Sequence, residues 1–258
     1  MNKLIQIEFL KTKRSFARYI YLTVPLILLL FTFLTVHRTG NPSGLYKNSI
    51  PTIQISFFNL WPLIISHLVI INGTYFNLQL DKKSRYRELC LSNNWSLVTN
   101  FIAKSIVLTL YYGISTIVFI TISIYSVYVT TKQLPNISLI IETAVVIFLS
   151  QVCLIQLNLF LLKYLNVIIV FILNFILIIA SIIYTVLGNL FWLIPHGYSL
   201  KIVTIMMGIH PNGVPLESSS IYYQQVGDLH ALGITMLSSC IVFVIAFVIN
   251  IASLHSRK

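Results

Sequence analysis

The chain has 258 residues, of which 57% are hydrophobic and only 9% are charged, and its mean hydropathy is +0.88. A soluble core of this length cannot bury so much apolar surface, so the composition excludes a soluble globular protein and indicates a membrane protein. The formal net charge is +11, but the basic residues gather beside apolar stretches, where they favour contact with anionic lipid rather than nucleic acid.

Six long apolar stretches divide the sequence. Each reaches the roughly 18 to 25 residues that an α-helix needs to cross about 30 Å of hydrocarbon. Their apolar residues are continuous rather than alternating, which favours helices over strands. We therefore predict a single all-α membrane domain, residues 1–258, with six transmembrane helices. The predicted spans are Tyr19–Val36, Ile53–Leu78, Phe101–Tyr128, Ile137–Leu162, Val167–Leu187 and Ala231–Leu254.

Lysine and arginine are distributed unequally between the two sides of this arrangement. Thirteen of the 17 lie before the first span, in the second–third and fourth–fifth connections, or in the C-terminal tail. The other four are Arg38, Lys47, Lys132 and Lys201. Because cytoplasmic loops carry the excess of basic residues, we expect both termini in the cytoplasm.

The segment before the first span, residues 1–18, predicts a helix that lies on the inner leaflet. On a helical projection Ile5, Phe9, Phe16 and Ile20 share one side. The opposite side carries Glu8, Lys11, Arg14, Ser15 and Arg18. This pattern is typical of an interfacial elbow helix, although an ordinary positive-inside flank remains the alternative. No small-x-small cleavage site follows the first apolar run, which therefore resembles a signal anchor.

The longest cytoplasmic connection between spans, residues 81–98, mixes four cations with aromatic and leucine side chains. Its part Asp81–Trp95 predicts a short amphipathic helix with one face for a soluble partner. A solvated loop that anchors its aromatic residues at the interface is the alternative. The candidate contact residues are Arg85, Tyr86, Arg87, Glu88 and Leu89, together with Arg14 of the first segment.

Polar side chains inside the predicted spans are mostly amides. Gln151, Gln156 and Asn158 cluster on the fourth span and are candidates for a polar substrate path, although such amides more commonly hold helices together. Glu142 is the only acid inside a span, and it lies about one turn from the outer end, where a helix N-terminus can accommodate it. We find no ionisable partners for a proton relay.

The connection between the fifth and sixth spans, residues 188–230, is too apolar for a free loop and too rich in Pro and Gly for one helix. It contains Trp192 and the apolar run Ile202–Ile209. We predict short helices that pack at the outer interface or dip partly into it, with their large apolar side chains buried. Trp192 is a further candidate for the substrate path.

The sequence lacks the motifs of an enzyme. It has no Gly-x-x-x-x-Gly-Lys-Ser/Thr loop for ATP, no His-Glu-x-x-His and no surroundings for a serine nucleophile. His196 and His210 have no Cys, carboxylate or i+4 His partners. Cys90, Cys153 and Cys240 suggest neither a zinc site nor a disulfide. We expect no catalytic residue, metal or cofactor in this chain.

Several short features occur together along the chain. The stretch Glu8–Ser15 leads into the first span, the second–third connection is basic, and the fifth–sixth connection carries Trp192-x-x-Pro195 and His210-Pro-Asn-Gly213. With the six-span layout, these features resemble the ABC-2-type permeases of lantibiotic immunity transporters, relatives of the bacitracin-resistance permeases. The resemblance covers essentially the whole chain. Frequent Ile, Asn and Lys with little Ala also resemble the residue usage of a low-GC Gram-positive bacterium.

The resemblance implies a permease subunit of the bacterial cytoplasmic membrane, paired with a second similar permease and driven by two copies of a cytoplasmic ABC ATPase that binds ATP and Mg²⁺. In that family the elbow helix and the second–third loop receive the motion of the ATPase, which maps to Ile5–Ile20 and Asp81–Trp95. The implied substrate is an amphipathic, often cationic antimicrobial peptide that is expelled from the membrane, giving self-immunity or resistance. A non-transport membrane sensor or scaffold that binds such a peptide is the alternative.

Overall fold

The computed structural model describes residues 2–13, 15–38, 46–47, 50–93, 95–187 and 190–255. The chain is about 82% helical. Among the described residues, five helical segments are long and apolar enough to cross a membrane, so the chain is an all-α membrane protein. These segments are Phe16–Leu34, Thr52–Lys83, Leu97–Thr131, Ile137–Tyr164 and Leu229–Leu254.

The N-terminal segment contains three helices: α1 (Asn2–Thr12), α2 (Phe16–Thr23) and α3 (Ile27–Arg38). The predicted elbow Ile5–Ile20 is therefore divided between α1 and α2. The predicted first span is also divided, because the turn around Pro25 separates α2 from α3, and proline cannot supply a helical N–H.

The predicted two faces of the elbow need a correction. Glu8 is fully buried and Lys11 is largely buried, whereas Phe16 is 63% exposed. The helical projection sorted these residues by polarity alone, but the two charged groups have partners of opposite charge within the fold, and Phe16 packs edge-to-face on Phe76.

The second span is also interrupted. A two-residue hairpin, β1 (Tyr46–Lys47) and β2 (Ile50–Pro51), leads into α4 (Thr52–Leu60). A π-helical turn, η2 (Trp61–Ile65), then joins α4 to α5 (Ser66–Lys83). Pro62 lies within this turn and lacks the N–H that a regular helix would use, which accounts for a wider turn at this point.

The next three long helices agree closely with the predicted spans. A short helix, α6 (Tyr86–Ser92), precedes α7 (Leu97–Thr131), which is followed by α8 (Ile137–Tyr164) and α9 (Val167–Leu187). Ser96 and Asn136 cap the N-termini of α7 and α8 by accepting hydrogen bonds from backbone N–H groups of the first turn. Helix α8 occupies the centre of the bundle and packs against α5, α7, α10 and α11.

The connection after α9 folds back into the bundle. It contains η3 (Pro195–Gly197), α10 (Tyr198–Met207) and η4 (Ile221–Gln225) before α11 (Leu229–His255). Every residue of α10 except Met206 is buried. A helix that is buried on all sides belongs to the interior, so α10 enters the helix bundle between α8 and α11. Of the large apolar side chains expected to be buried, Tyr198, Ile202, Ile205 and Ile209 are buried, and Met206 is partly buried.

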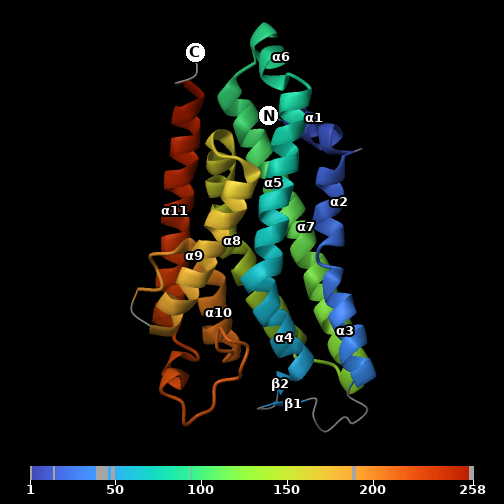
Figure 1. Ribbon diagram of the computed structural model, residues 1–258, viewed down its shortest axis with the longest axis vertical. Helices are drawn as coiled ribbons and strands as arrows, with labels where there is room; N and C mark the ends of the chain where they lie inside the picture. Colours follow the sequence, from blue (N-terminus) through green and yellow to red (C-terminus); the bar gives the residue numbers. More distant parts are fainter. Residues whose placement is uncertain are drawn as a thin grey trace.

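Figure 1 shows α6, α1 and both chain termini toward one end of the elongated bundle. The β-hairpin and the connection between α10 and α11 lie toward the other end. We call the first of these the α6 end. The arrangement places the N-terminal helix α1 beside the segment that was predicted to contact a soluble partner.

Candidate functional site

Helix α6 projects from the end of the bundle (Figure 1). The chain reverses before it at Arg85, whose φ of 47° lies in the left-handed region. The far part of α6 is tied to α7, because the Asn100 amide donates a hydrogen bond to Cys90 Sγ at 3.1 Å. The side chains of Arg85 and Glu88 are 81% and 72% exposed, and Leu89 is exposed beside them. The α6 end therefore offers a charged surface with an apolar group to a partner.

The other residues predicted for this contact can be placed only in part. Tyr86 and Arg87 lie within α6, whereas Arg14 lies outside the described residues. The structure does contain the short helix that the sequence predicted between Asp81 and Trp95.

Four charged side chains from three helices form a network beside α6. Asp81, near the end of α5, contacts Lys11 of α1 at 2.5 Å and also pairs with Lys104 of α7. Lys11 contacts Glu8 at 2.6 Å. Burial lowers the pKa of Lys11, while the negative charge of Glu8 opposes this shift. Because buried charges are tolerated only when paired, Asp81 is the residue that links α1, α5 and α7, since its carboxylate contacts both lysines.

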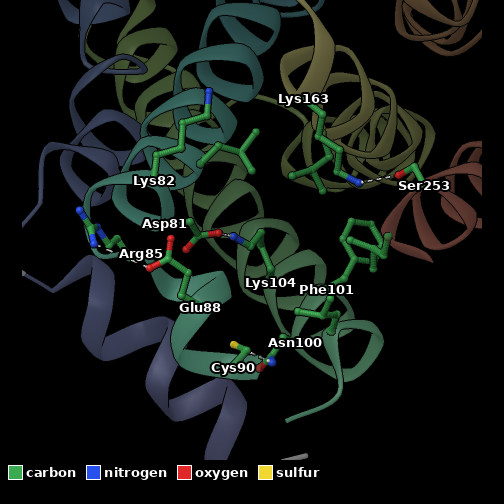
Figure 2. A pocket seen from close by; sticks show the side chains of 14 residues that line it. Asp81, Lys82, Arg85, Glu88, Cys90, Asn100, Phe101, Lys104, Lys163 and Ser253 are labelled. Carbon is green, nitrogen blue, oxygen red and sulfur yellow. Dashed lines mark hydrogen bonds and ion pairs between the residues drawn. The ribbon is translucent and has the colours of Figure 1, made fainter. Parts of the chain in front are cut away.

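A cavity of about 360 Å³ opens beside the network, between α5, α6, α7, α8 and α11 (Figure 2). Lys163 of α8 lies on the opposite side of the cavity from Asp81 (Figure 2). The ammonium group of Lys163 donates hydrogen bonds to Asn250 Oδ1 at 2.8 Å and Ser253 Oγ at 3.2 Å. It also lies 5.1 Å from the centre of the Phe101 ring. These contacts fix one cation at the wall of the cavity.

A second group of polar side chains lies near the middle of the bundle. Gln151, near the centre of α8, donates hydrogen bonds to Ser66 of α5 at 2.9 Å and to Ser199 of α10 at 3.0 Å. Tyr112 of α7 donates its hydroxyl hydrogen to Gln151 Oε1. All four side chains are buried. One amide thus joins four helices and holds the beginning of α10 at the depth of the span centres.

A separate chain of amide and imidazole groups joins α8, α9, η3 and α5. Asn174 of α9 donates to Asn158 Oδ1 at 3.1 Å, and Asn174 Oδ1 lies 2.8 Å from His196 Nε2. The His196 ring stacks on His67 of α5, with ring centroids 5.5 Å apart. Both amide atoms of Gln156 are buried without a hydrogen-bond partner among the described residues. Gln156 therefore retains unused polar groups inside the bundle.

Three of the four residues predicted for the substrate path are buried in the bundle interior: Gln151, Gln156 and Asn158. Trp192 is separate, because its side chain is 43% exposed, contrary to the expected burial of this residue. Its backbone carbonyl accepts a hydrogen bond from Tyr198 Oη at 2.7 Å, so the backbone at Trp192 supports the start of α10 while the ring faces outward.

Sequence reasoning did not find the partners of these amides. Ser66 and Ser199 are common residue types with no pattern of their own, and His196 drew attention only as a metal ligand. The available signals were His67 and Asn174, polar residues inside apolar spans, since such groups normally face a protein interior. His196, the ring partner of His67, reaches it only because the chain after α9 folds back into the bundle.

Comparisons of this chain with family models, with curated proteins and with solved structures give no match.

Proposed function

We propose that this chain is the permease subunit of an ATP-driven exporter of the ABC-2 type. The observation that carries the proposal is the network at the α6 end, in which Asp81 joins Lys11 of α1 to Lys104 of α7 directly beside the exposed helix α6. A partner that moves α6 would act on the ends of α5 and α7 and, through Asp81, on the N-terminal helix. ATP hydrolysis would take place in the partner, which binds ATP and Mg²⁺.

We further propose that the chain has six spans and that both termini lie in the cytoplasm of a bacterium. The residue usage supports a Gram-positive origin. Helix α9 is the sixth candidate. Its apolar stretch Val167–Ile183 is shorter than the other five spans, but it belongs to a helix of 21 residues, which is long enough to cross about 30 Å of hydrocarbon. The excess of basic residues at the α6 end supports this orientation. An even number of spans also agrees with the two termini lying toward one end of the bundle (Figure 1).

Inside the bundle, the route of motion would run along α5. The π-helical turn η2 immediately precedes Ser66, which Gln151 joins to Ser199 of α10. Wider helical turns of this kind often occur at functional sites, and they allow one part of a helix to shift relative to the next. A displacement of α5 at the α6 end would therefore be transmitted to α10. The connection that follows α10 lies toward the other end of the bundle (Figure 1).

The proposed substrate is an amphipathic, often cationic antimicrobial peptide, and the proposed outcome is self-immunity or resistance. Gln151, Gln156 and Asn158 are the polar groups that a peptide backbone would meet between α8 and its neighbours. A second similar permease subunit and two ATPase copies would complete the transporter. The chain itself would contribute no catalytic residue.

Purification of the full chain with its native partners tests this proposal. A P-loop ATPase should copurify, and its hydrolysis should respond to the peptide in the presence of the chain. Copurification of a kinase instead, or peptide binding without any ATPase partner, would favour a membrane sensor or scaffold and overturn the transporter.

A further inference from the structure

The cavity beside α6 has a ligand chemistry that the proposed transport function does not use. We propose that it binds the phosphate group of an anionic phospholipid from the adjacent leaflet. The proposal requires only that the chain spans a membrane, so its test does not depend on the transporter assignment. It rests on the position of the cavity, the nature of its walls and the distribution of its charges.

The position of the cavity matches the headgroup level of a bilayer. Most of its lining residues lie within about two turns of an end of a long helix: the C-terminal ends of α5, α8 and α11 and the N-terminal end of α7. The other lining residues lie in α6 or just before it. Helix ends of transmembrane spans lie where hydrocarbon gives way to lipid headgroups. A ligand in this cavity would therefore be at the depth of a phosphate and its glycerol backbone.

The walls of the cavity, like a phospholipid, have a charged part and an apolar part. One part of the lining is apolar and consists of Leu78, Leu97, Phe101, Leu159 and Leu254. The charged part contains four cations and two acids, namely Lys82, Arg85, Lys104, Lys163, Asp81 and Glu88. The excess of positive charge attracts an anion, while the leucine side chains suit the first carbons of acyl chains. The volume of about 360 Å³ lies at the lower end of the range for small-ligand sites.

The cations do not all have the same role. Asp81 pairs with Lys104, and Arg85 lies 4.0 Å from Glu88. Lys163 is positioned by the oxygens of α11 and by the Phe101 ring, and Lys82 is exposed, with a long side chain that can turn toward the cavity. A phosphate held between Lys82 and Lys163 would bridge α5 and α8 across the opening.

A soluble phosphate ion is also negatively charged, but it makes no favourable contact with the apolar wall. The shared chemistry is therefore a phosphate group, and the leucine-lined side favours the lipid as its source. Basic pockets between transmembrane helices near the membrane surface bind the headgroups of anionic lipids.

The test uses the full chain in nanodiscs of phosphatidylcholine that contain traces of spin-labelled phosphatidylglycerol. The motionally restricted fraction of the label gives the relative affinity of the protein for this lipid. We expect the label to associate more strongly than spin-labelled phosphatidylcholine. Lys163→Gln and Lys82→Gln should each weaken the association of phosphatidylglycerol about fivefold. Lys82→Gln changes an exposed side chain, so it remains informative if Lys163→Gln impairs folding.

Lys83→Gln is the matched control, because Lys83 is an exposed neighbour of Lys82 that does not line the cavity. It removes the same charge and should leave lipid selectivity unchanged. An equal loss in Lys83→Gln would mean a diffuse surface attraction and overturn the proposal. The absence of selectivity in the unmodified chain would also overturn it. Displacement of the labelled lipid by millimolar inorganic phosphate would assign the site to a soluble ligand and refute the lipid assignment.

Discussion

Asp81 and Lys11 meet at 2.5 Å although they are 70 residues apart in the sequence. Their contact fixes helix α1 against the end of α5, and Thr12 adds a hydrogen bond of 2.7 Å to Tyr111 of α7. Helix α1 is therefore attached by specific polar contacts as well as by its apolar side. These contacts hold α1 against both α5 and α7.

Replacing Asp81 with Asn should loosen α1. The substitution leaves Lys11 and Lys104 without the carboxylate that both contact, and losing one partner of a buried charge pair costs about 3–5 kcal/mol. The thermal unfolding temperature in detergent should fall, and limited proteolysis should cut near α1. Glu88→Gln is the control, because Glu88 is exposed and its contact with Arg85 is long. Equal stability of the two variants would contradict the proposed role of Asp81.

Gly73→Ala should separate α2 from α5. A methyl group at Gly73 would overlap the ring of Tyr21, which is fully buried and stacks on Tyr111. Overpacking of this kind costs about 1–3 kcal/mol. In contrast, Gly233→Ala in α11 meets nothing within 4 Å, so it should be neutral or stabilise the helix slightly. Thermal unfolding of the two variants in the same detergent measures the difference, and a stable Gly73→Ala variant would refute this close packing.

Gly213→Ala and Gly227→Ala form a second matched pair. Both glycines have a positive φ, of 81° and 77°, so alanine should cost about 1–2 kcal/mol at either position. At Gly213 the new methyl group would also overlap the amide of Asn59, whereas nothing lies within 4 Å at Gly227. Gly213→Ala should therefore lower the unfolding temperature more. Adding Asn59→Ala should remove most of the excess, and failure to do so would argue against this contact.

Cysteines placed at Ile202 and Ile209 should react slowly with a membrane-impermeant thiol reagent, because these side chains are 0% and 1% exposed. Val214→Cys, at a position that is 41% exposed, should react rapidly. The experiment needs a Cys240→Ser background, since Cys240 is exposed. Adding Gln151→Leu should accelerate labelling at Ile202 by releasing Ser199 of α10. Rapid labelling of Ile202 without that change would contradict the inward position of α10.

Long apolar runs made the regular helices predictable. The sequence predicted the start of α8 at Ile137 and both ends of α9, and the ends of α7 and α11 fall within a few residues of the predicted ones. Local properties determine where these helices form: continuous hydrophobic residues and, for α8, Asn136 as the N-cap.

The features that were not predictable depend on distant partners. Glu8 looked like a residue on a polar face, but it is buried beside Lys11. No local pattern reveals that Lys11 also pairs with Asp81. The apolar run of α10 indicated burial but not whether the chain packs on the interface or enters the bundle. That choice depends on Gln151, which lies 48 residues from Ser199. The amides of α8 were found as a group, but their partners were not.

The proposed contact with an ATPase also predicts the effect of charge reversal. Arg85→Glu combined with Arg87→Glu should leave the chain in the membrane but lower the ATP-dependent resistance, since both positions lie at the α6 end. Lys132→Glu reverses a charge at the C-terminal cap of α7 and should have little effect. Normal resistance in the double variant, at normal expression, would count against α6 as the contact.

Photo-crosslinking from α6 tests the central proposal most directly. A photoreactive amino acid would replace Leu89, which is 49% exposed on α6, or Leu134, which is 72% exposed between α7 and α8. In native membranes, the probe at Leu89 should crosslink to a P-loop ATPase, and the probe at Leu134 should not. Crosslinking of Leu89 to a kinase, or to no ATPase while the chain remains functional, would contradict the assignment of this chain as an ATP-driven permease.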